Sequence, residues 1–356
     1  MDAVDRDFSS ADDFVSYLEK DYNLGEVPES VNFIGAINDC RSEKAFIDSL
    51  GSHFDRVDST GDLYLLKGDT GEEYVPYYVY VDDEFPVFIT TANITDEMPP
   101  TINSYLQQSK DVGRFWLSKR QMEALREELI SRYDGDILIP FFSAKRGMFS
   151  EIGARKRPGT KRRITYYADD GLETYREMRM EYGVLPTILE FERPNHFKFR
   201  VKDKGVFVHE SGSVQELWRT LKKETEHKSR IKEYIDTGEA TEPESTVFQN
   251  KTISVSRPWG IKVDPGLHRD HLDGFKSHLQ NEELEFGVSE YNSYPEIPSF
   301  DAELIDHSSY ETTKLMTKED TIQVYPRELT DVDQSFRIYN FVSDHFGPKC
   351  EPVAVE

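Results

Sequence analysis

The sequence predicts an α+β protein of several domains, with mixed or antiparallel sheets and packed helices. Runs rich in Tyr, Val, Ile and Phe are separated by Gly and Asp turns, which is typical of antiparallel strands. Between these runs, capped segments carry apolar residues three and four positions apart, as amphipathic helices do. Neither GxGxxG nor GxxxxGK[ST] precedes a helix, so the sequence has no Rossmann or P-loop signature.

The first third of the chain alternates helical and strand patterns. Helices are expected at 9–22 and 42–51, because serines precede apolar residues at helical spacing, and the second should stop at Gly51 in a left-handed conformation. A meander of three strands is expected next, at 62–68, 73–82 and 85–93. Two helices should follow, at 98–109 and at 118–133, where Ser118 and Gln121 form a capping box.

The middle third predicts the order strand, loop, strand, helix, three strands, helix. The expected strands are 136–144, 162–168, 187–193, 196–203 and 205–211, and the expected helices are 172–183 and 213–234. In the last third the patterns predict strands at 252–263 and 321–329 and helices at 267–279 and 333–347. Residues 291–313 read as loop-rich, and no internal repeat appears at a fixed period.

Composition limits the classes of protein to consider. The 356 residues include 22 Phe and 19 Tyr, which favours packed structure over disorder, and a net charge of -24 suggests a halophilic-like acidic surface. Cys40 and Cys350 lie far apart, which excludes a cysteine-rich zinc site and fits a reducing compartment. No apolar run approaches 18 residues and the start lacks a signal-peptide pattern, so a soluble cytoplasmic protein that does not bind membrane is expected.

Charge divides the chain into three parts and a linker. Residues 1–134 carry 12 basic and 28 acidic side chains and are expected to form an acidic α+β domain. Residues 135–235 carry 21 and 15 and should form a basic α+β segment, whereas 247–356 should form a second acidic α+β domain. The polar, turn-rich stretch 236–246 is the expected linker.

The basic residues concentrate in a loop expected at 145–163. This stretch contains eight cations and a single acid, Glu151, and its glycines and Pro158 predict an extended, mobile loop with a Pro-Gly turn. A second basic feature is the alternation after His196, which should turn Phe197, Phe199 and Val201 inward and their basic neighbours outward. The candidate nucleic-acid-binding residues are Lys145, Arg146, Arg155, Lys156, Arg157, Lys161, Arg162, Arg163, Lys198, Arg200 and Lys202.

Two acid pairs offer a catalytic alternative. "YVDD" at 80–83 and "YADD" at 167–170 resemble the Tyr-x-Asp-Asp signature of reverse-transcriptase-like polymerases, in which the aspartates help to hold magnesium. The residues after Asp170 have helical spacing, so "YADD" is interpreted as the start of a helix. Strand patterns flank "YVDD", which predicts a hairpin whose tip carries Asp82, Asp83 and Glu84 as candidate metal ligands.

These observations favour a nucleic-acid-binding accessory or regulatory protein that contacts phosphates of DNA or RNA through its basic middle segment. One alternative is an interaction module whose basic loop docks on an acidic protein partner. Another is a metal-dependent enzyme that processes nucleic acid, for which Mg²⁺ would be the cofactor. A salt-rich host argues against the favoured hypothesis, because salt weakens phosphate binding.

Overall fold

The computed structural model describes most of the chain. The described residues are 8–23, 30–40, 42–60, 63–81, 84–109, 111–146, 153–236, 258–264, 266–267, 272, 275, 279, 286–294, 298–307, 310–326, 332–346 and 350–355.

The chain folds into two compact units. The first comprises Met1–Lys145, Arg163–Arg179 and Leu185–Glu226. The second comprises Arg146–Arg162, Met180–Val184 and His227–Glu356. The three-part division by charge is not tested by this and stays a prediction. The expected linker 236–246 lies outside the described residues, except that Asp236 ends a helix.

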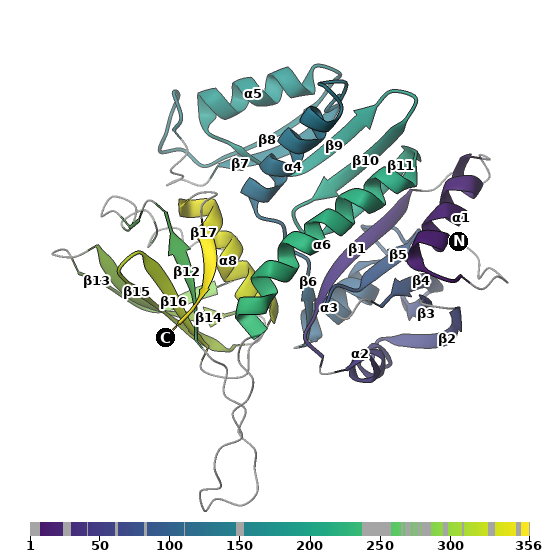
Figure 1. The fold of residues 1–356 in the computed structure, drawn as a ribbon, viewed down its shortest axis with the longest axis horizontal. Coiled ribbons are helices and arrows are strands. Elements are labelled where there is room, and N and C mark those ends of the chain that lie inside the picture. Colours follow the sequence, from purple (N-terminus) through teal and green to yellow (C-terminus); the bar gives the residue numbers. More distant parts are fainter. Residues whose placement is uncertain are drawn as a thin grey trace, which may run out of the picture. The chain divides into compact units, whose positions relative to one another are not determined.

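An 11-stranded sheet is the scaffold of the first unit (Figure 1), and β1 lies near its centre. The strands that come first in the chain are β1 (Val31–Asn38), β2 (Phe54–Thr60), β3 (Leu63–Asp69), β4 (Tyr74–Tyr80), β5 (Val87–Thr90) and β6 (Val112–Arg114). Strands β2 to β5 form an antiparallel meander whose last strand pairs with one edge of β1. The other edge of β1 is shared, because the short β6 pairs only with Ala36–Asn38.

The rest of that edge, Val31–Ile34, pairs with β11 and so joins five later strands to the same sheet. These strands are β7 (Phe141–Arg146), β8 (Arg162–Tyr167), β9 (Leu185–Arg193), β10 (Phe197–Lys202) and β11 (Val206–Gly212). Their order from β1 outward is β11-β10-β9-β7-β8, which leaves β8 at the edge of the sheet.

Helices cover β1 on both faces, and every residue of this strand is buried. On one face, Phe46, Leu50 and Tyr105 from the helices share a core cluster with Ile34 of β1. On the other face, the Trp218 ring lies 6.2 Å from that of Phe33. The helices carried by this sheet are α1 (Ala11–Asn23), α2 (Glu43–Leu50), the π-helix η1 (Pro99–Asn103), α3 (Ser104–Gln108), α4 (Lys119–Arg132), α5 (Gly171–Tyr182) and α6 (Val214–Asp236).

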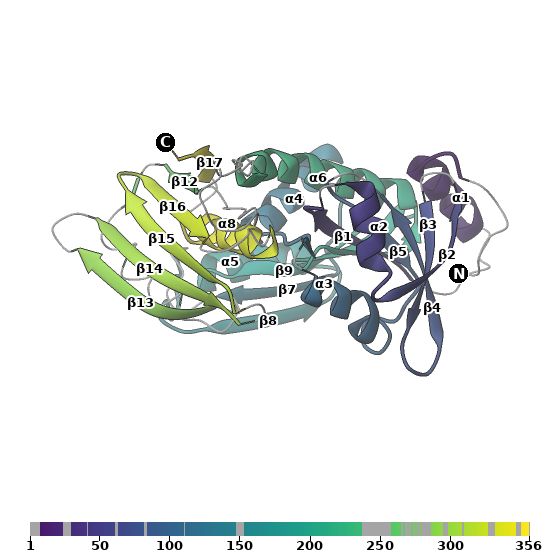
Figure 2. The ribbon, with the colours of Figure 1, turned by 90° about the horizontal axis from the view of Figure 1, so that it is seen from below.

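The second unit contains a six-stranded antiparallel sheet in the order β13-β14-β15-β16-β12-β17, with helix α8 (Val332–Phe346) across one face (Figure 2). Its strands are β12 (Trp259–Val263), β13 (Phe286–Tyr294), β14 (Ser299–Asp306), β15 (Thr312–Lys318), β16 (Thr321–Pro326) and β17 (Cys350–Ala354). Between β12 and β13, the described residues Leu272, Phe275 and Leu279 are helical and buried.

The two sheets share one topology. In the first, β1 is followed by a helix, a four-stranded meander, a further helix and β6, and β1 lies between β5 and β6. In the second, β12 is followed by helical residues, the meander β13 to β16, helix α8 and β17, and β12 lies between β16 and β17. The chain therefore contains a structural repeat that its sequence does not reveal by periodicity.

The α+β class with antiparallel sheets is confirmed, as is the element order predicted for the middle third. Ser118 and Gln121 form the predicted capping box of α4. The interpretation of "YADD" as a helix start is also confirmed, because α5 begins at Gly171, where a side chain would meet the Ile139 carbonyl oxygen at 2.0 Å.

Two local predictions were wrong. Gly51 follows α2 with φ -63°, a right-handed conformation, so the helix does not end in a left-handed cap. The stretch 291–313, expected to be loop-rich, supplies all of β14 and parts of β13 and β15. Within β14 buried and half-buried residues alternate, but Ile305 on the half-buried face and the buried Asp306 break the apolar-polar alternation in the sequence.

No helix in the described parts of the chain is long and apolar enough to cross a membrane.

Candidate nucleic-acid interface

The basic segment between β7 and β8 is anchored where it is described. Arg146, at the end of β7, is only 6% exposed. Its guanidinium donates hydrogen bonds to the carbonyl oxygens of Pro158 (3.1 Å) and Gly183 (3.2 Å). The segment between the two strands begins after Arg146 and ends before Arg162. Arg146 does not face solvent, and it holds the later part of this segment through Pro158.

The last residues of α5 provide a second anchor. The amide of Lys156 donates to the Glu181 carbonyl oxygen at 2.8 Å, and its ammonium lies 2.7 Å from the Glu181 carboxylate. This hydrogen bond lowers the pKa of Glu181 and raises the pKa of Lys156. The Arg162 guanidinium lies 3.9 Å from the centre of the Tyr182 ring. Lys156 and Arg162 therefore hold this part of the segment to the end of α5, and the expected mobility of the loop stays a prediction.

The predicted Pro-Gly turn is present at the tip of the segment. The Thr160 amide donates to the Arg157 carbonyl oxygen at 3.2 Å, which closes a four-residue turn with Pro158 and Gly159 at its centre. Arg157 adopts a φ of 49°, which is uncommon for a residue with a side chain. The turn and the residues beside it carry four exposed cationic side chains, which we call the basic crest: Arg155, Lys156, Arg157 and Lys161.

Two of the four crest cations share one carboxylate. Glu181 contacts Lys156 closely and the Arg155 guanidinium more loosely, at 3.9 Å. Both cations remain largely exposed, and the Arg157 guanidinium makes no ion pair with a described residue. Glu181 therefore faces two of the crest cations, and the charge of Arg157 is left for a ligand.

The candidates on the flanking strands differ in exposure. Lys145, on β7, is half-buried and has a polar partner. Arg163 and Tyr167 are exposed on β8, whereas Tyr166 stacks on Phe142 with ring centres 5.5 Å apart. Tyr167, which is 74% exposed, is therefore the aromatic side chain on this strand that is accessible for stacking on a base.

The second basic feature is neutralised by glutamates. Phe197, Phe199 and Val201 are buried and their neighbours half-buried, so the predicted alternation is confirmed. However, the Lys198 ammonium lies 3.0 Å from Glu190, and the Arg200 guanidinium pairs with Glu190 and with Glu210 (2.9 Å).

Lys202, the third basic residue of β10, is no better suited to binding a polyanion. Burial, and next the positive charge of Arg200, lower the pKa of Lys202. Lys198 and Arg200 thus belong to a compensated charge cluster and Lys202 is half-buried, which does not favour a phosphate-binding role for these three residues.

The proposed metal ligands receive no support. Strands β4 and β5 form the predicted hairpin, but Asp82 and Asp83 at its tip lie outside the described residues. Glu84 is half-buried, and its carbonyl oxygen accepts from the Asn38 amide at 2.7 Å. Among the residues with a described position, no three His, Cys, Asp or Glu side chains gather closely enough to hold a metal ion.

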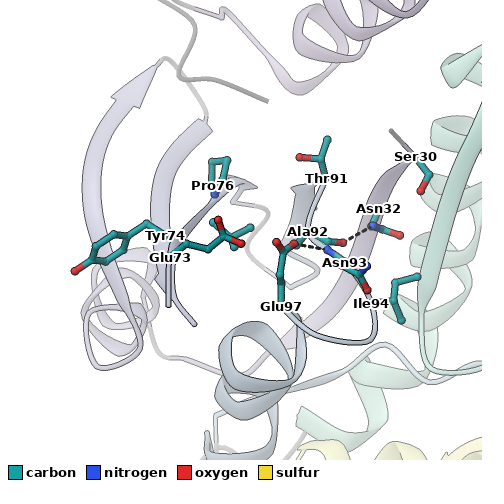
Figure 3. A pocket seen from close by; sticks show the side chains of 11 residues that line it. Ser30, Asn32, Glu73, Tyr74, Pro76, Thr91, Ala92, Asn93, Ile94 and Glu97 are labelled. Carbon is teal, nitrogen blue, oxygen red and sulfur yellow. Dashed lines mark hydrogen bonds between the residues drawn. The ribbon is translucent and has the colours of Figure 1, made fainter. Parts of the chain in front are cut away.

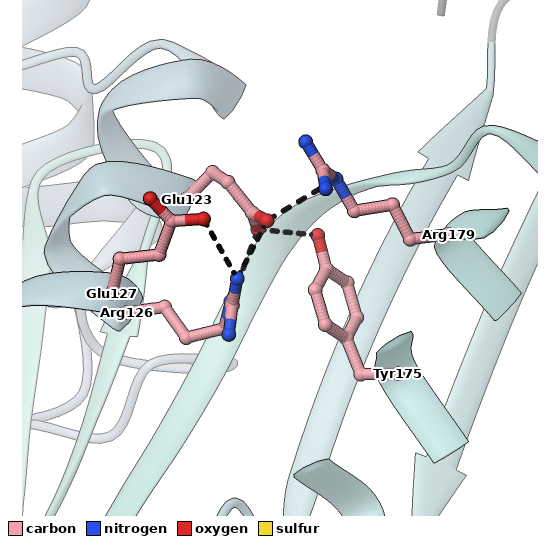
Figure 4. Close-up of polar contacts among 5 residues, drawn as sticks. All are labelled: Glu123, Arg126, Glu127, Tyr175 and Arg179. Atoms are coloured by element: carbon pink, nitrogen blue, oxygen red, sulfur yellow. Dashed lines mark hydrogen bonds and ion pairs between the residues drawn. The ribbon is translucent and has the colours of Figure 1, made fainter. Parts of the chain in front are cut away.

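A buried ion cluster fixes α5 against α4 (Figure 4). The Glu123 carboxylate of α4 accepts from the Arg126 guanidinium at 2.7 Å and from the Tyr175 hydroxyl at 2.6 Å, and Arg179 approaches it to 3.2 Å. Burial alone would raise the pKa of Glu123, but the contacts with Arg126 and the other two groups outweigh it, and the pKa is lowered. The cluster positions the helix whose end holds the basic segment.

Comparison with known proteins gives a partial match to a family model and one distant relative, and neither indicates an activity. Residues 120–204 match the family model AF_0896_M, described as a family middle domain. An uncharacterized protein of Archaeoglobus fulgidus is 25% identical over 353 residues, which cover 96% of this chain and 95% of the relative. No solved structure matches. The matched region contains the Glu123 cluster, the basic segment and strands β7 to β10.

Three partners of the basic residues were not predicted, namely Glu181, Tyr182 and Glu190. The partners of Lys198 and Arg200 could have been found, because a hairpin turn at 194–196 sets Lys198 opposite Glu192 and Arg200 opposite Glu190. The contacts of Glu181 and Tyr182 with the basic segment carry no sequence signal, since about twenty residues separate them from their partners.

Proposed function

We propose that the protein binds nucleic acid through the basic crest, as a cytoplasmic accessory or regulatory protein. The observation that carries the proposal is a set of exposed cations on a turn held in place by buried Arg146 and by the end of α5. An anchored turn fixes the backbone from which the cationic side chains project before a ligand binds. Phosphate binding therefore costs less conformational entropy. Arginine also matches phosphate oxygens with two parallel N–H groups.

The charge of the rest of the chain supports selective rather than general binding. The net charge of -24 repels polyanions from most of the surface. A ligand would therefore have to approach the crest itself, where Glu181 offsets only part of the positive charge. The same crest would also suit an acidic protein partner, and this is the alternative that the test must separate.

The test measures binding of labelled single-stranded and duplex DNA and RNA by fluorescence anisotropy across a KCl series. The crest variant carries Arg155→Ser, Arg157→Ser and Lys161→Ser. Arg146 and Arg162 stay unchanged, because one is buried and the other stacks on Tyr182, so their loss would disturb the turn. We expect Kd to rise at least about tenfold and the slope of log K against log salt to fall by about 2–3, since each phosphate contact contributes about 0.7–0.9.

A matched control removes three exposed cations elsewhere, with Lys44→Ser, Lys67→Ser and Arg219→Ser. It loses the same charge and should bind nearly as the unchanged protein does. Equal weakening by both variants, or no binding by the unchanged protein at low salt, would overturn the proposal. Capture of an acidic protein by the crest without nucleic-acid binding would favour the interaction module, and magnesium-dependent cleavage of the probe would favour the enzyme.

A further inference from the structure

A cavity of about 610 Å³ opens in the first unit beside the start of β1 (Figure 3). Its wall comes from three places, which are the start of β1, the turn that leads into β4, and the segment that follows β5. Its volume is in the range of sites for small molecules. The cavity is separate from the basic crest, and nothing in the proposed function uses it.

Asn32 contributes a buried acceptor to this cavity. The side chain is only 2% exposed, and its amide nitrogen donates to the Ala92 carbonyl oxygen at 3.0 Å. Its carbonyl oxygen Oδ1 has no hydrogen-bond partner among the described residues. A buried acceptor left without a donor is destabilising, so a ligand that donates a hydrogen bond there would be favoured.

The charged and aromatic groups in the wall favour a cation. Among the described residues, the lining includes the carboxylates of Glu73 and Glu97 and neither lysine nor arginine. One oxygen of Glu97 accepts from the Asn93 amide at 2.5 Å, which fixes this carboxylate at the rim. The Tyr74 ring, 59% exposed, offers an aromatic face on which a cation can rest.

We propose that this cavity binds the ammonium group of a small aliphatic amine, of the diamine or polyamine class. An alkylammonium has three N–H donors, which the Asn32 carbonyl oxygen and the two carboxylates can accept. Its methylene chain suits the Tyr74 ring and the proline and valine side chains of the wall. An anion would be repelled by Glu73 and Glu97.

A metal ion is the less suitable cation for this wall. Divalent cations require several oxygen ligands at short, fixed distances. The described residues hold no group of three His, Cys, Asp or Glu side chains with that geometry. An organic cation tolerates a looser set of acceptors and gains from the aromatic ring.

The test is isothermal titration with putrescine and spermidine at fixed ionic strength, with 1,4-butanediol as the neutral probe of similar length. We expect saturable binding of the amines and none of the diol. Glu73→Gln and Glu97→Gln should each weaken binding about tenfold. Glu72→Gln, which removes an exposed carboxylate next to the cavity but outside its wall, should change Kd less than twofold. The side-chain amide resonances of Asn32 should shift on addition of putrescine.

Several results would overturn the proposal. Equal weakening by Glu72→Gln would mean that the amines associate diffusely with an acidic surface. Equal binding of the diol would remove the role of charge, and unshifted Asn32 resonances would place the amine elsewhere. Since the crest variant keeps this cavity intact, loss of nucleic-acid binding and loss of amine binding are separate outcomes.

Discussion

His209 is a histidine held in its neutral form inside the first unit. It lies on β11, is fully buried, and its Nε2 is 3.0 Å from the Gly212 carbonyl oxygen. Burial lowers the pKa of His209, and the Gly212 carbonyl and the charge of Glu19 oppose this only in part. A proton on this ring would be a buried charge, so the folded state excludes it while the unfolded chain accepts it near pH 6.5.

Stability should therefore fall as the pH drops through the ordinary range of histidine. The folded pKa lies below the unfolded value of about 6.5, so the stabilising contribution is fully present above that pH and is lost below it. The measurement is the free energy of urea unfolding at about pH 7.5 and about pH 5.5, for the unchanged protein and for His209→Gln. Glutamine can still donate to Gly212, and the variant should show the smaller pH dependence. Identical pH dependence in the two proteins would contradict this assignment.

At the scale of elements, the contact between α4 and α5 depends on one carboxylate. Glu123 is buried together with Tyr175 and Arg126, so water does not readily replace a partner that a substitution removes. Burial of three polar groups is tolerated because each finds a partner in the others. The end of α5 in turn supplies Glu181, so the order of the basic segment depends on how this helix is held.

Glu123→Gln should destabilise the protein by about 3–5 kcal/mol, because Arg126 then loses its buried ionic partner and keeps only the exposed Glu127. Tyr175→Phe should cost about 1–2 kcal/mol, the price of one buried hydrogen bond. Chemical unfolding followed by far-UV circular dichroism measures both changes.

Glu127→Gln is the control for the Glu123 variant. Glu127 also contacts Arg126, at 3.2 Å, but it is 63% exposed, so its loss should cost no more than about 1 kcal/mol. Similar losses of stability in Glu123→Gln and Glu127→Gln would show that burial of the cluster does not decide its strength.

The elements that could be predicted are those with a strong local pattern. The capping box of α4 and the hairpin of β4 and β5 follow from residues within a few positions of one another. Strand β2 and the short β6 could not be predicted, since their shape depends on pairing with distant strands. In β14 the buried Phe300, Ala302 and Leu304 alternate with residues that the sequence alone presents as a polar loop.

The candidate site was predictable in its charge and not in its anchors. Consecutive cations between two strand patterns and the Pro-Gly turn are visible in the sequence. That Arg146 is buried and holds Pro158 and Gly183 depends on the folded path of the chain. A list of basic residues therefore overestimates the surface available to a ligand, and Lys198 and Arg200 are the clearest cases.

At the scale of the whole molecule, the repeated topology shows how one arrangement is used in two ways. In the first sheet β6 has three residues and leaves part of β1 free to pair with β11, which extends the sheet. In the second sheet the five residues of β17 pair along the whole of β12. The length of the last strand thus decides whether further strands can join at that edge.

The charge of the chain also acts on the whole molecule. With 67 acidic and 43 basic side chains, the folded state concentrates like charge that the unfolded chain can spread out. Salt screens this repulsion, and at about 1 M the Debye length is only about 3 Å. Salt also weakens exposed ion pairs such as Lys156–Glu181, but exposed pairs contribute little to stability. The buried Glu123–Arg126 pair is screened little.

Relief of repulsion should therefore dominate, and the Tm should rise as KCl is increased from about 0.05 to about 1 M. A variant that carries Asp55→Asn, Asp96→Asn and Glu351→Gln removes three exposed negative charges and separates charge from other effects of salt. Its Tm should exceed that of the unchanged protein at low KCl, and the difference should shrink as KCl rises, because screening removes the repulsion that the substitutions relieve. Differential scanning calorimetry measures both trends. A difference that stays constant across the series would mean that like-charge repulsion does not limit the stability of this fold.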